Sequence, residues 1–349
     1  MKGSLERVRA IIQGDTPDRP ALYDLLRNDA VLSRFAGEPL TLENAREVVY
    51  RAHGPAIDAT RSVRMPGREE TVFLEDGRRL RHFRWTTWTE HVRYADSAAY
   101  AVAKRRAIAG YTDAWVKADG EAMEKYLADV ADNRERLGEV FFFPSVSAVG
   151  FMGITGEVVL EAFSYHLADC PDLIDDLLEV HTRRSVKWID HLPEGHGIEA
   201  VFCGDDIAYK SGPMLSPRWF GQHYFHRLAR VSDAFHRKGI KVLFHSDGDL
   251  NPILDGLVEA GIDGLNPIEV LANMDAGAIH RKHPRLFLAG GIDVSQLLPL
   301  GTPAEIRDAV RRALDGTGGR LMVGSTTELN NEVPLANYLA LREAVLTYR

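Results

Sequence analysis

Cysteine is scarce in this chain of 349 residues, which contains only Cys170 and Cys203. Two cysteines without a CxxC spacing cannot build a disulfide framework, so a reducing cytoplasm is the simplest location. Long apolar runs are also missing, since no stretch approaches the ~18 residues that a membrane helix needs. The charged N-terminal segment lacks the apolar centre of a signal peptide. We therefore expect a soluble, cytoplasmic protein that does not act on a membrane.

Excess positive charge is lacking as well. The formal net charge is −8 and the pI is near 5.9, and no basic stripe is visible, which argues against nucleic acid as a partner. No glycine-rich dinucleotide fingerprint follows an early strand, which counts against a doubly wound open sheet, the structural alternative. What the chain does have is 45% hydrophobic residues, enough for one large core or two modest ones.

The second half of the chain alternates apolar runs with amphipathic segments, the pattern of βα repeats around a parallel sheet. Earlier apolar runs near Leu22 and Phe141 bring the strand count close to eight. We therefore predict an α/β protein with one domain, residues 1–349, folded as a single (β/α)8 TIM barrel with insertions in the N-terminal half. The apolar runs lie at 200–203, 242–244, 262–265, 286–289 and 321–323, and the helical segments at 217–238, 251–260, 274–280 and 303–314.

One insertion has a recognisable pattern of its own. Residues 69–92 alternate at period two around Asp76 and Gly77, which is a strong hairpin signal, so we predict a solvent-facing β-hairpin there. Its tryptophans, Trp85 and Trp88, are more typical of packing than of a stacking platform for a ligand.

Polar residues follow each apolar run of the second half, where a barrel would bring all of them to one mouth. Several carboxylates in one pocket repel each other unless a cation or protons balance them. A metal, a cationic substrate or general-acid chemistry would each satisfy that requirement. The residues at these strand ends are Asp205, Asp206, His245, Ser246, Asp247, Asn266, Glu269, Asp293 and Glu328.

Structural roles are open alternatives for several of these residues. One of Asp205 and Asp206, and also Asp293, could cap a neighbouring segment, and His245 could be a buried histidine held by a neighbour. Cys203 could be a soft metal ligand or simply a small buried thiol. Four further residues are more typical of structural or surface positions: Asp249 in a turn, and His223, His226 and His236 on a helix.

Several phrases together resemble the uroporphyrinogen decarboxylase superfamily over nearly the whole chain. They are ERVRAIIQGDTPDRP, GDDIAYKSGPMLSPRWF, KVLFHSDGDLNPILDGLVEAGIDGLNPIE, LFLAGGIDVSQLLPLGTPAEIRDAVRRAL and EVPLANYLAL. The resemblance implies a (β/α)8 barrel with its active cleft at the C-terminal mouth. It also implies one of two chemistries, because the superfamily contains both cofactor-free decarboxylases and cobamide-dependent methyltransferases and O-demethylases.

The decarboxylase branch uses an arginine-rich RQAGRY-type loop, which is absent here. Arg27, after the first strand, is the only nearby candidate, and a mouth lined by carboxylates has the wrong sign for a polycarboxylate porphyrinogen. The methyltransferase branch commonly holds zinc through a His-x-Cys pair and a further cysteine near the last strand. In this chain His245 and Asp247 match the pair, and the last position falls near Thr327 and Glu328.

We therefore predict methyl transfer or demethylation of a small molecule, with a corrinoid protein as partner. The alternatives are a cofactor-free decarboxylase (a lyase) and a non-catalytic binding barrel, and the oligomeric state stays open, a homodimer being one possibility. The catalytic prediction is His245, Asp247 and Asp206, and the predicted zinc ligands are His245, Asp247 and Glu328. The predicted substrate-binding residues are Glu269, Asn266, Asp293, Arg27 and Asp205.

Overall fold

A parallel sheet of seven strands forms the centre of the computed structural model, which describes residues 3–110 and 113–349. Its strand order is β1-β14-β13-β12-β11-β8-β7, and every pairing in it is parallel. The predicted α/β class and parallel sheet are confirmed. The strands are β1 (Ala21–Leu22), β7 (Ser145–Ser147), β8 (Ala200–Gly204), β11 (Lys241–His245), β12 (Gly264–Asn266), β13 (Phe287–Ile292) and β14 (Leu321–Ser325).

Shorter strands flank this sheet. Strand β2 (Ala59–Thr60) pairs in parallel with β6 (Phe141–Phe142), and a single parallel bridge between Tyr23 and Ala59 joins β2 to the residues after β1. Strands β9 (Ala208–Tyr209) and β10 (Gly212–Pro213) form a small antiparallel pair.

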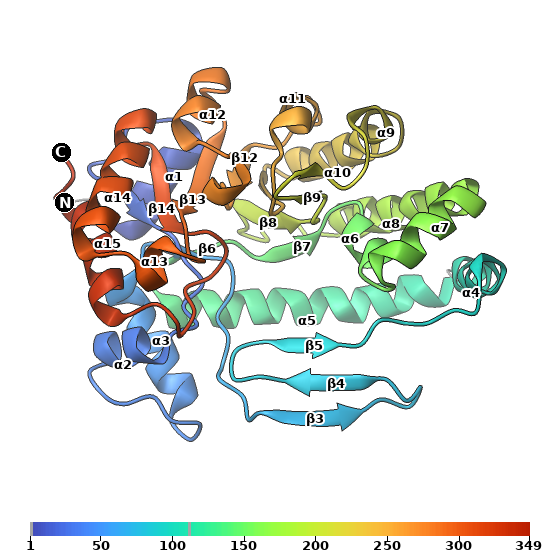
Figure 1. Cartoon of the computed structure of the whole chain (residues 1–349), viewed down its shortest axis with the longest axis horizontal. Helices are drawn as coiled ribbons and strands as arrows, with labels where there is room; N and C mark the ends of the chain where they lie inside the picture. The colour runs from blue at the N-terminus through green and yellow to red at the C-terminus, as the bar shows by residue number, and fades with distance from the viewer. Residues whose placement is uncertain (1–2, 111–112) are drawn as a thin grey trace.

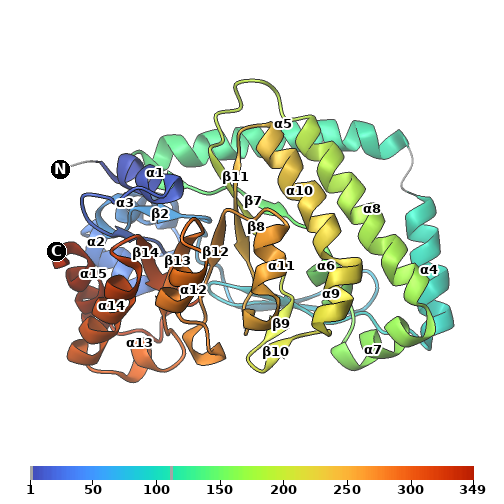
Figure 2. The same ribbon diagram turned by 90° about the horizontal axis from the view of Figure 1, so that it is seen from above.

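Helices surround the central sheet, and the two chain termini lie near each other at one end of the molecule (Figures 1 and 2). In the described part of the chain, none of them has both the length and the apolar character to span a bilayer. The N-terminal helices are α1 (Ser4–Gln13), α2 (Asp29–Ala36), α3 (Ala45–Ala56), α4 (Ser97–Ala109), α5 (Asp113–Leu137), α6 (Phe151–Thr155), α7 (Leu160–Asp169) and α8 (Pro171–Asp190). The C-terminal ones are α9 (Pro217–His223), α10 (Phe225–Arg237), η1 (Asn251–Ile253), α11 (Leu254–Glu259), η2 (Val270–Ala272), α12 (Ala276–Lys282), α13 (Leu297–Leu300), α14 (Pro303–Thr317) and α15 (Leu335–Thr347).

The predicted helix over 217–238 is in fact two helices, α9 and α10, that meet at Tyr224. Tyr224 is fully buried, and its hydroxyl donates a hydrogen bond of 3.0 Å to Asp205 Oδ2. This contact with the loop after β8 fixes the position of the break. Helical periodicity gives no sign of it, because the partner is far away in sequence.

The central strands are buried on both faces. Successive side chains point to opposite sides of a sheet, and here each side faces a core. Phe202, Leu243 and Met322 belong to a smaller core, which includes Val8 and Ile11 of α1. Their sequence neighbours, such as Val242 and Phe244, belong to a larger core between the sheet and the other helices. Burial on both faces explains why these strands read as continuous apolar runs in the sequence.

The predicted hairpin is present as an antiparallel sheet of three strands, β3 (Glu70–Phe73), β4 (Arg79–His82) and β5 (Thr87–Thr89). It lies outside the central sheet (Figure 1). Gly77 has a φ of 83°, which suits the turn between β3 and β4. Trp85 is buried and donates to Asp29 Oδ1 at 2.8 Å, as expected for a packing residue, whereas Trp88 is 43% exposed.

Candidate functional site

His245 is the last residue of β11, and the parallel register places it between Asn266 of β12 and Gly204 of β8. Its Nδ1 lies 2.8 Å from Asn266 Oδ1. The amide of Asn266 is itself oriented, because its Nδ2 donates to Ala289 O at 3.0 Å. Oδ1 can only accept, so His245 Nδ1 carries the proton and donates. In a neutral ring the lone pair is then on Nε2.

Two aspartates face this nitrogen. His245 Nε2 lies 3.6 Å from Asp206 Oδ1, and the backbone N–H of Asp247 donates to the same oxygen at 3.2 Å. Asp206, His245 and Asp247 each offer one ligand atom, and these atoms lie within 4.8 Å of one another. A neutral Nε2 and a carboxylate oxygen both present lone pairs, so this arrangement requires a proton or a cation between them.

Neighbouring residues hold the two aspartates in place. Thr327 Oγ1 donates to Asp247 Oδ1 at 2.8 Å. Ser246 Oγ accepts from Ile207 N at 3.0 Å and donates to Asp247 O at 2.8 Å, which ties the loop after β11 to the loop after β8. Gly248 has a φ of 95°, and a Cβ there would lie 2.6 Å from Ala208 C, so only glycine allows this bend.

The set of a histidine and two aspartates is suited to a divalent metal. Imidazole nitrogen and carboxylate oxygens are ligands that zinc accepts, and three protein ligands leave a position open for a water or a substrate. Metal-bound histidines usually donate their other ring N–H to an oxygen acceptor, and the Nδ1–H bond to Asn266 Oδ1 is such a contact. The residues present therefore fit a metal, although the ligand set differs from the predicted one in its third member.

Glu328, the predicted third ligand, lies outside this group. Its carboxylate pairs with the guanidinium of Arg27, a residue predicted to bind substrate. Arg27 is largely buried, and its guanidinium and the Glu328 carboxylate are each other's partners. Asp206 takes the place beside His245 and Asp247 that the sequence assigned to Glu328.

Glu269 lies beside the site and is engaged by the loop after β11. Its Oε2 accepts from Gly248 N at 2.8 Å, and its Oε1 lies 3.8 Å from Lys210 Nζ. It stands next to Asp247 in space without belonging to the group of three.

The carboxylates of Asp205 and Asp293, both predicted to bind substrate, face backbone N–H groups. Asp205 Oδ2 accepts from Gly150 N and Phe151 N at 3.1 Å each, which caps the start of α6. Burial raises its pKa to about 6, although these hydrogen bonds oppose the shift. Asp293 accepts from Gln296 N and Leu297 N at 2.8 Å and caps α13. The capping alternative accounts for these contacts of both residues.

A family model described as uroporphyrinogen decarboxylase matches residues 156–348. The chain belongs to the uroporphyrinogen decarboxylase family. A methyltransferase from Methanosarcina mazei has a similar solved structure, with a TM-score of 0.68 and 18% sequence identity, covering 100% of this chain and 99% of that chain. At this identity the likeness shows a shared fold. A search of curated proteins finds no match.

The matched part of this uroporphyrinogen decarboxylase family member contains Asp206, His245 and Asp247 together with their supporting residues Asn266 and Thr327. The N-terminal part adds residues that sequence reasoning did not single out. Arg61 follows β2 directly, and its guanidinium carbon lies 4.1 Å from the centre of the Phe202 ring. Asp24 follows β1, accepts from Ser325 Oγ at 2.7 Å, and has its pKa raised to about 6 by burial. Each follows a strand of only two residues, which leaves almost no pattern in the sequence.

The remaining predictions concern residues away from the site. Cys203 is a buried thiol whose pKa is raised by burial, as expected for a packing residue. Asp249 Oδ1 accepts from Asn251 N at 3.0 Å and forms the expected turn. His236 is an exposed helix residue that pairs with Asp263, and His223 is a half-buried one that pairs with Asp175.

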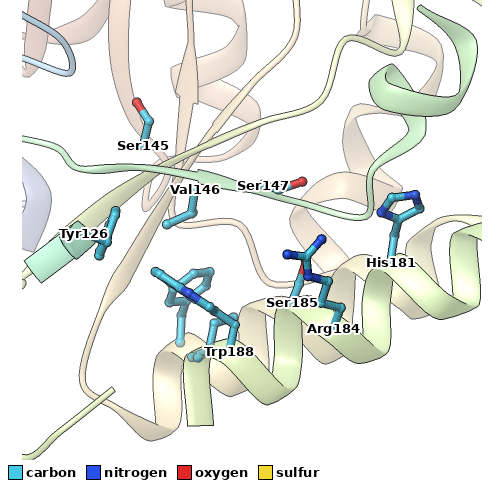
Figure 3. Close-up of a pocket in the computed structure, with 10 residues that line it drawn as sticks. Tyr126, Ser145, Val146, Ser147, His181, Arg184, Ser185 and Trp188 are labelled. Atoms are coloured by element: carbon cyan, nitrogen blue, oxygen red, sulfur yellow. The ribbon is translucent and has the colours of Figure 1, made fainter. Parts of the chain in front are cut away.

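A separate cavity of about 320 Å³ lies between α5, β7 and α8 (Figure 3). Tyr126, Ser145 and Trp188 are among the residues that line it. None of the predicted site residues does. It lies between the sheet and its covering helices, apart from the strand ends that hold His245.

Proposed function

We propose that this protein is an enzyme that transfers a methyl group from a small-molecule substrate, at a zinc-dependent site formed by Asp206, His245 and Asp247. The observation that carries the proposal is the grouping of ligand atoms, in which His245 Nε2 faces the carboxylate of Asp206 with Asp247 beside it. The family to which the chain belongs and the methyltransferase fold of its solved neighbour support this reading. A corrinoid protein as methyl carrier remains part of the proposal.

The complete architecture belongs to the proposal too. We infer one domain built as a closed (β/α)8 barrel. The Tyr23–Ala59 bridge and the β2–β6 pairing support it, since they connect the two ends of the central sheet through β2, β6 and the segment that continues into β7. In such a barrel the residues after β8, β11 and β12 open on one mouth.

The chain's own residues perform distinct tasks in this scheme. Asn266 fixes the ring of His245, so that Nε2 is available to hold zinc together with one oxygen each from Asp206 and Asp247. When bound, zinc supplies a Lewis acid that makes an ether or amine a better leaving group. Thr327 orients Asp247 through its hydrogen bond. Glu269, at the edge of the group, is placed to contact the part of the substrate that does not react.

Metal analysis of the purified protein tests the proposal. We expect about one zinc per chain in the wild type and loss of zinc in His245→Ala, Asp206→Ala and Asp247→Ala. Glu328→Gln is the matched control, because Glu328 pairs with Arg27, and this variant should keep its zinc. Zinc retained in Asp206→Ala but lost in Glu328→Gln would replace the proposed ligand set with the one read from the sequence.

Activity is measured with cob(I)alamin as methyl acceptor, and methylcobalamin formation is followed by its visible spectrum. Transfer that is lost on chelation and restored by zinc agrees with the proposal. Transfer that continues at the same rate after exhaustive chelation contradicts a zinc-dependent site.

A cofactor-free decarboxylase is the second candidate, and Arg61 favours it. This partly buried cation lies within electrostatic reach of Asp206 and Glu328, at a site for which the sequence alone predicts an acidic lining. In that reading Asp206 or Asp247 stabilises charge that develops on the substrate. Release of CO2 from a carboxylic acid by the chelated protein would favour this second function over the first.

A further inference from the structure

Arg61 occupies a position inside the fold, next to the proposed site. It directly follows β2, whose first residue, Ala59, belongs to the smaller core. Its guanidinium rests on the ring of Phe202, which belongs to that core as well. The other neighbour of this ring is His245, with the two ring centres 4.9 Å apart. Arg61 and His245 therefore both contact Phe202 at the end of the smaller core.

Two buried polar atoms at this place lack a hydrogen-bond partner among the described residues. They are Nε of Arg61 and the hydroxyl oxygen of Tyr23. Tyr23 is 1% exposed, and its hydroxyl and the Arg61 guanidinium interact electrostatically. The hydroxyl oxygen can accept from the guanidinium, but the Tyr23 O–H and the Arg61 Nε–H still lack an acceptor among the described residues, and buried donors in folded proteins are nearly always paired.

The acidic residues near Arg61 are already engaged with other partners. Asp206 accepts from Asp247 N and faces His245, and Glu328 pairs with Arg27. Arg27 repels Arg61 electrostatically, and Arg64 in turn lies near the Arg27–Glu328 pair. A guanidinium stays charged in a protein, and burial without a dedicated counter-ion is unfavourable. One further negative charge close to Arg61 would therefore be favourable.

We propose that Arg61, assisted by the Tyr23 hydroxyl, binds a carboxylate group of the substrate. The inference deepens the proposed function and rests on it, because it names small carboxylic acids as the substrate class of the same site. A planar carboxylate matches the fork of a guanidinium, while a phosphate dianion, with its greater charge, would be repelled more strongly by Asp206 and Glu328. Bound in this way, the carboxylate directs the rest of the substrate along Phe202 toward His245.

Calorimetric titration of the wild type with benzoate, benzamide and inorganic phosphate tests this proposal. We expect benzoate to bind, and benzamide and phosphate to bind at least about tenfold more weakly, since a charge-assisted hydrogen bond discriminates by this order. Arg61→Gln should lose about tenfold or more in benzoate affinity, and Tyr23→Phe should lose a smaller part. Arg134→Gln is the control, because Arg134 is another partly buried arginine, and it lies beside Glu199 and Tyr126.

Three outcomes would overturn the proposal. They are phosphate bound in preference to benzoate, benzamide bound as well as benzoate, and equal benzoate affinity in the wild type, Arg61→Gln and Tyr23→Phe. Tyr23→Phe removes a single oxygen, so it decides the matter should Arg61→Gln fail to fold. Zinc content, measured on the same samples, reports on the proposed function separately, because Arg61 is not among the proposed ligands.

Discussion

At the scale of single residues, the chemistry of this site depends on an amide rather than on another charge. Asn266 cannot change its protonation state, and its Nδ2 is held by Ala289 O, so its Oδ1 is a fixed acceptor for His245. A carboxylate in this place would stabilise a doubly protonated imidazole. The amide instead selects the tautomer with the proton on Nδ1, so that Nε2 faces Asp206 and is available to a metal.

Asn266→Ala should therefore weaken zinc binding about tenfold to a hundredfold, the usual effect of losing the hydrogen-bond acceptor of a metal-binding histidine. His245 would keep its place in β11 but lose the contact that selects its tautomer. The measurement is a competition titration with a chelator of known affinity, and the nitrogen chemical shifts of His245 report the tautomer. Thr327→Val is a useful comparison, because it removes only the hydrogen bond to Asp247. An unchanged zinc affinity in Asn266→Ala would show that the ring orientation is set by packing against Phe202.

At the scale of elements, the charged residues of the N-terminal phrase ERVRAIIQGDTPDRP join α1 to the sheet. Arg7 donates to Asp58 Oδ1 at 2.7 Å, and Arg19 reaches both oxygens of Asp58 at 2.8 and 2.9 Å. Leu22 N of β1 donates to the same carboxylate at 2.8 Å. Asp58 directly precedes β2, so one buried carboxylate connects α1, β1 and β2. This part of the family resemblance therefore describes structure rather than catalysis.

The pKa of Asp58 gives this network a pH dependence. Burial opposes its ionisation, but hydrogen bonds from Arg19, Ser4 and Leu22 outweigh burial, so the pKa lies below its ordinary value of 3.8. A folded pKa below the unfolded one means stabilisation that is present above pH 3.8 and is lost as the pH falls further. Asp58→Asn should cost about 3 kcal/mol of unfolding free energy at pH 7, because it leaves buried arginine charge uncompensated.

Urea denaturation at several pH values checks this expectation. The difference between the wild type and Asp58→Asn should shrink below pH 4. Asp255→Asn serves as the control, since Asp255 is an exposed partner of Lys282 and should contribute no more than about 1 kcal/mol. A difference that stays constant down to pH 3 would mean that the neutral hydrogen bonds, rather than the charge, hold α1 to the sheet.

At the scale of the whole molecule, the sequence predicts the strands of the second half because they are buried on both faces. A strand such as β11 must then be apolar at consecutive positions, and its end is marked by the change to His245. The short strand β2 has no such run, so the sequence shows neither the strand nor Arg61 after it. The roles of Asp205 and Glu328 depend on partners more than fifty residues away. Local pattern identified the strand ends that meet, but not which carboxylates already have partners.

Zinc should also stabilise the whole fold, because the site without metal holds the carboxylates of Asp206 and Asp247 close together. A ligand at a hundredfold excess over its Kd adds about 2.7 kcal/mol, which for a chain of this length corresponds to a rise of about 4 °C in Tm. Removing one carboxylate relieves repulsion, so Asp206→Asn in chelator should melt at or above the wild type. Calorimetry should then give the wild type the higher Tm with zinc, and Asp206→Asn an equal or higher Tm without it. Such a reversal is expected where a functional site lowers the stability of the fold. Glu328→Gln should respond to zinc as the wild type does. Asp206→Asn could instead be less stable than the wild type in chelator as well. The three residues would then be a structural network, in which Asp206 accepts a hydrogen bond from protonated His245 and no metal is bound.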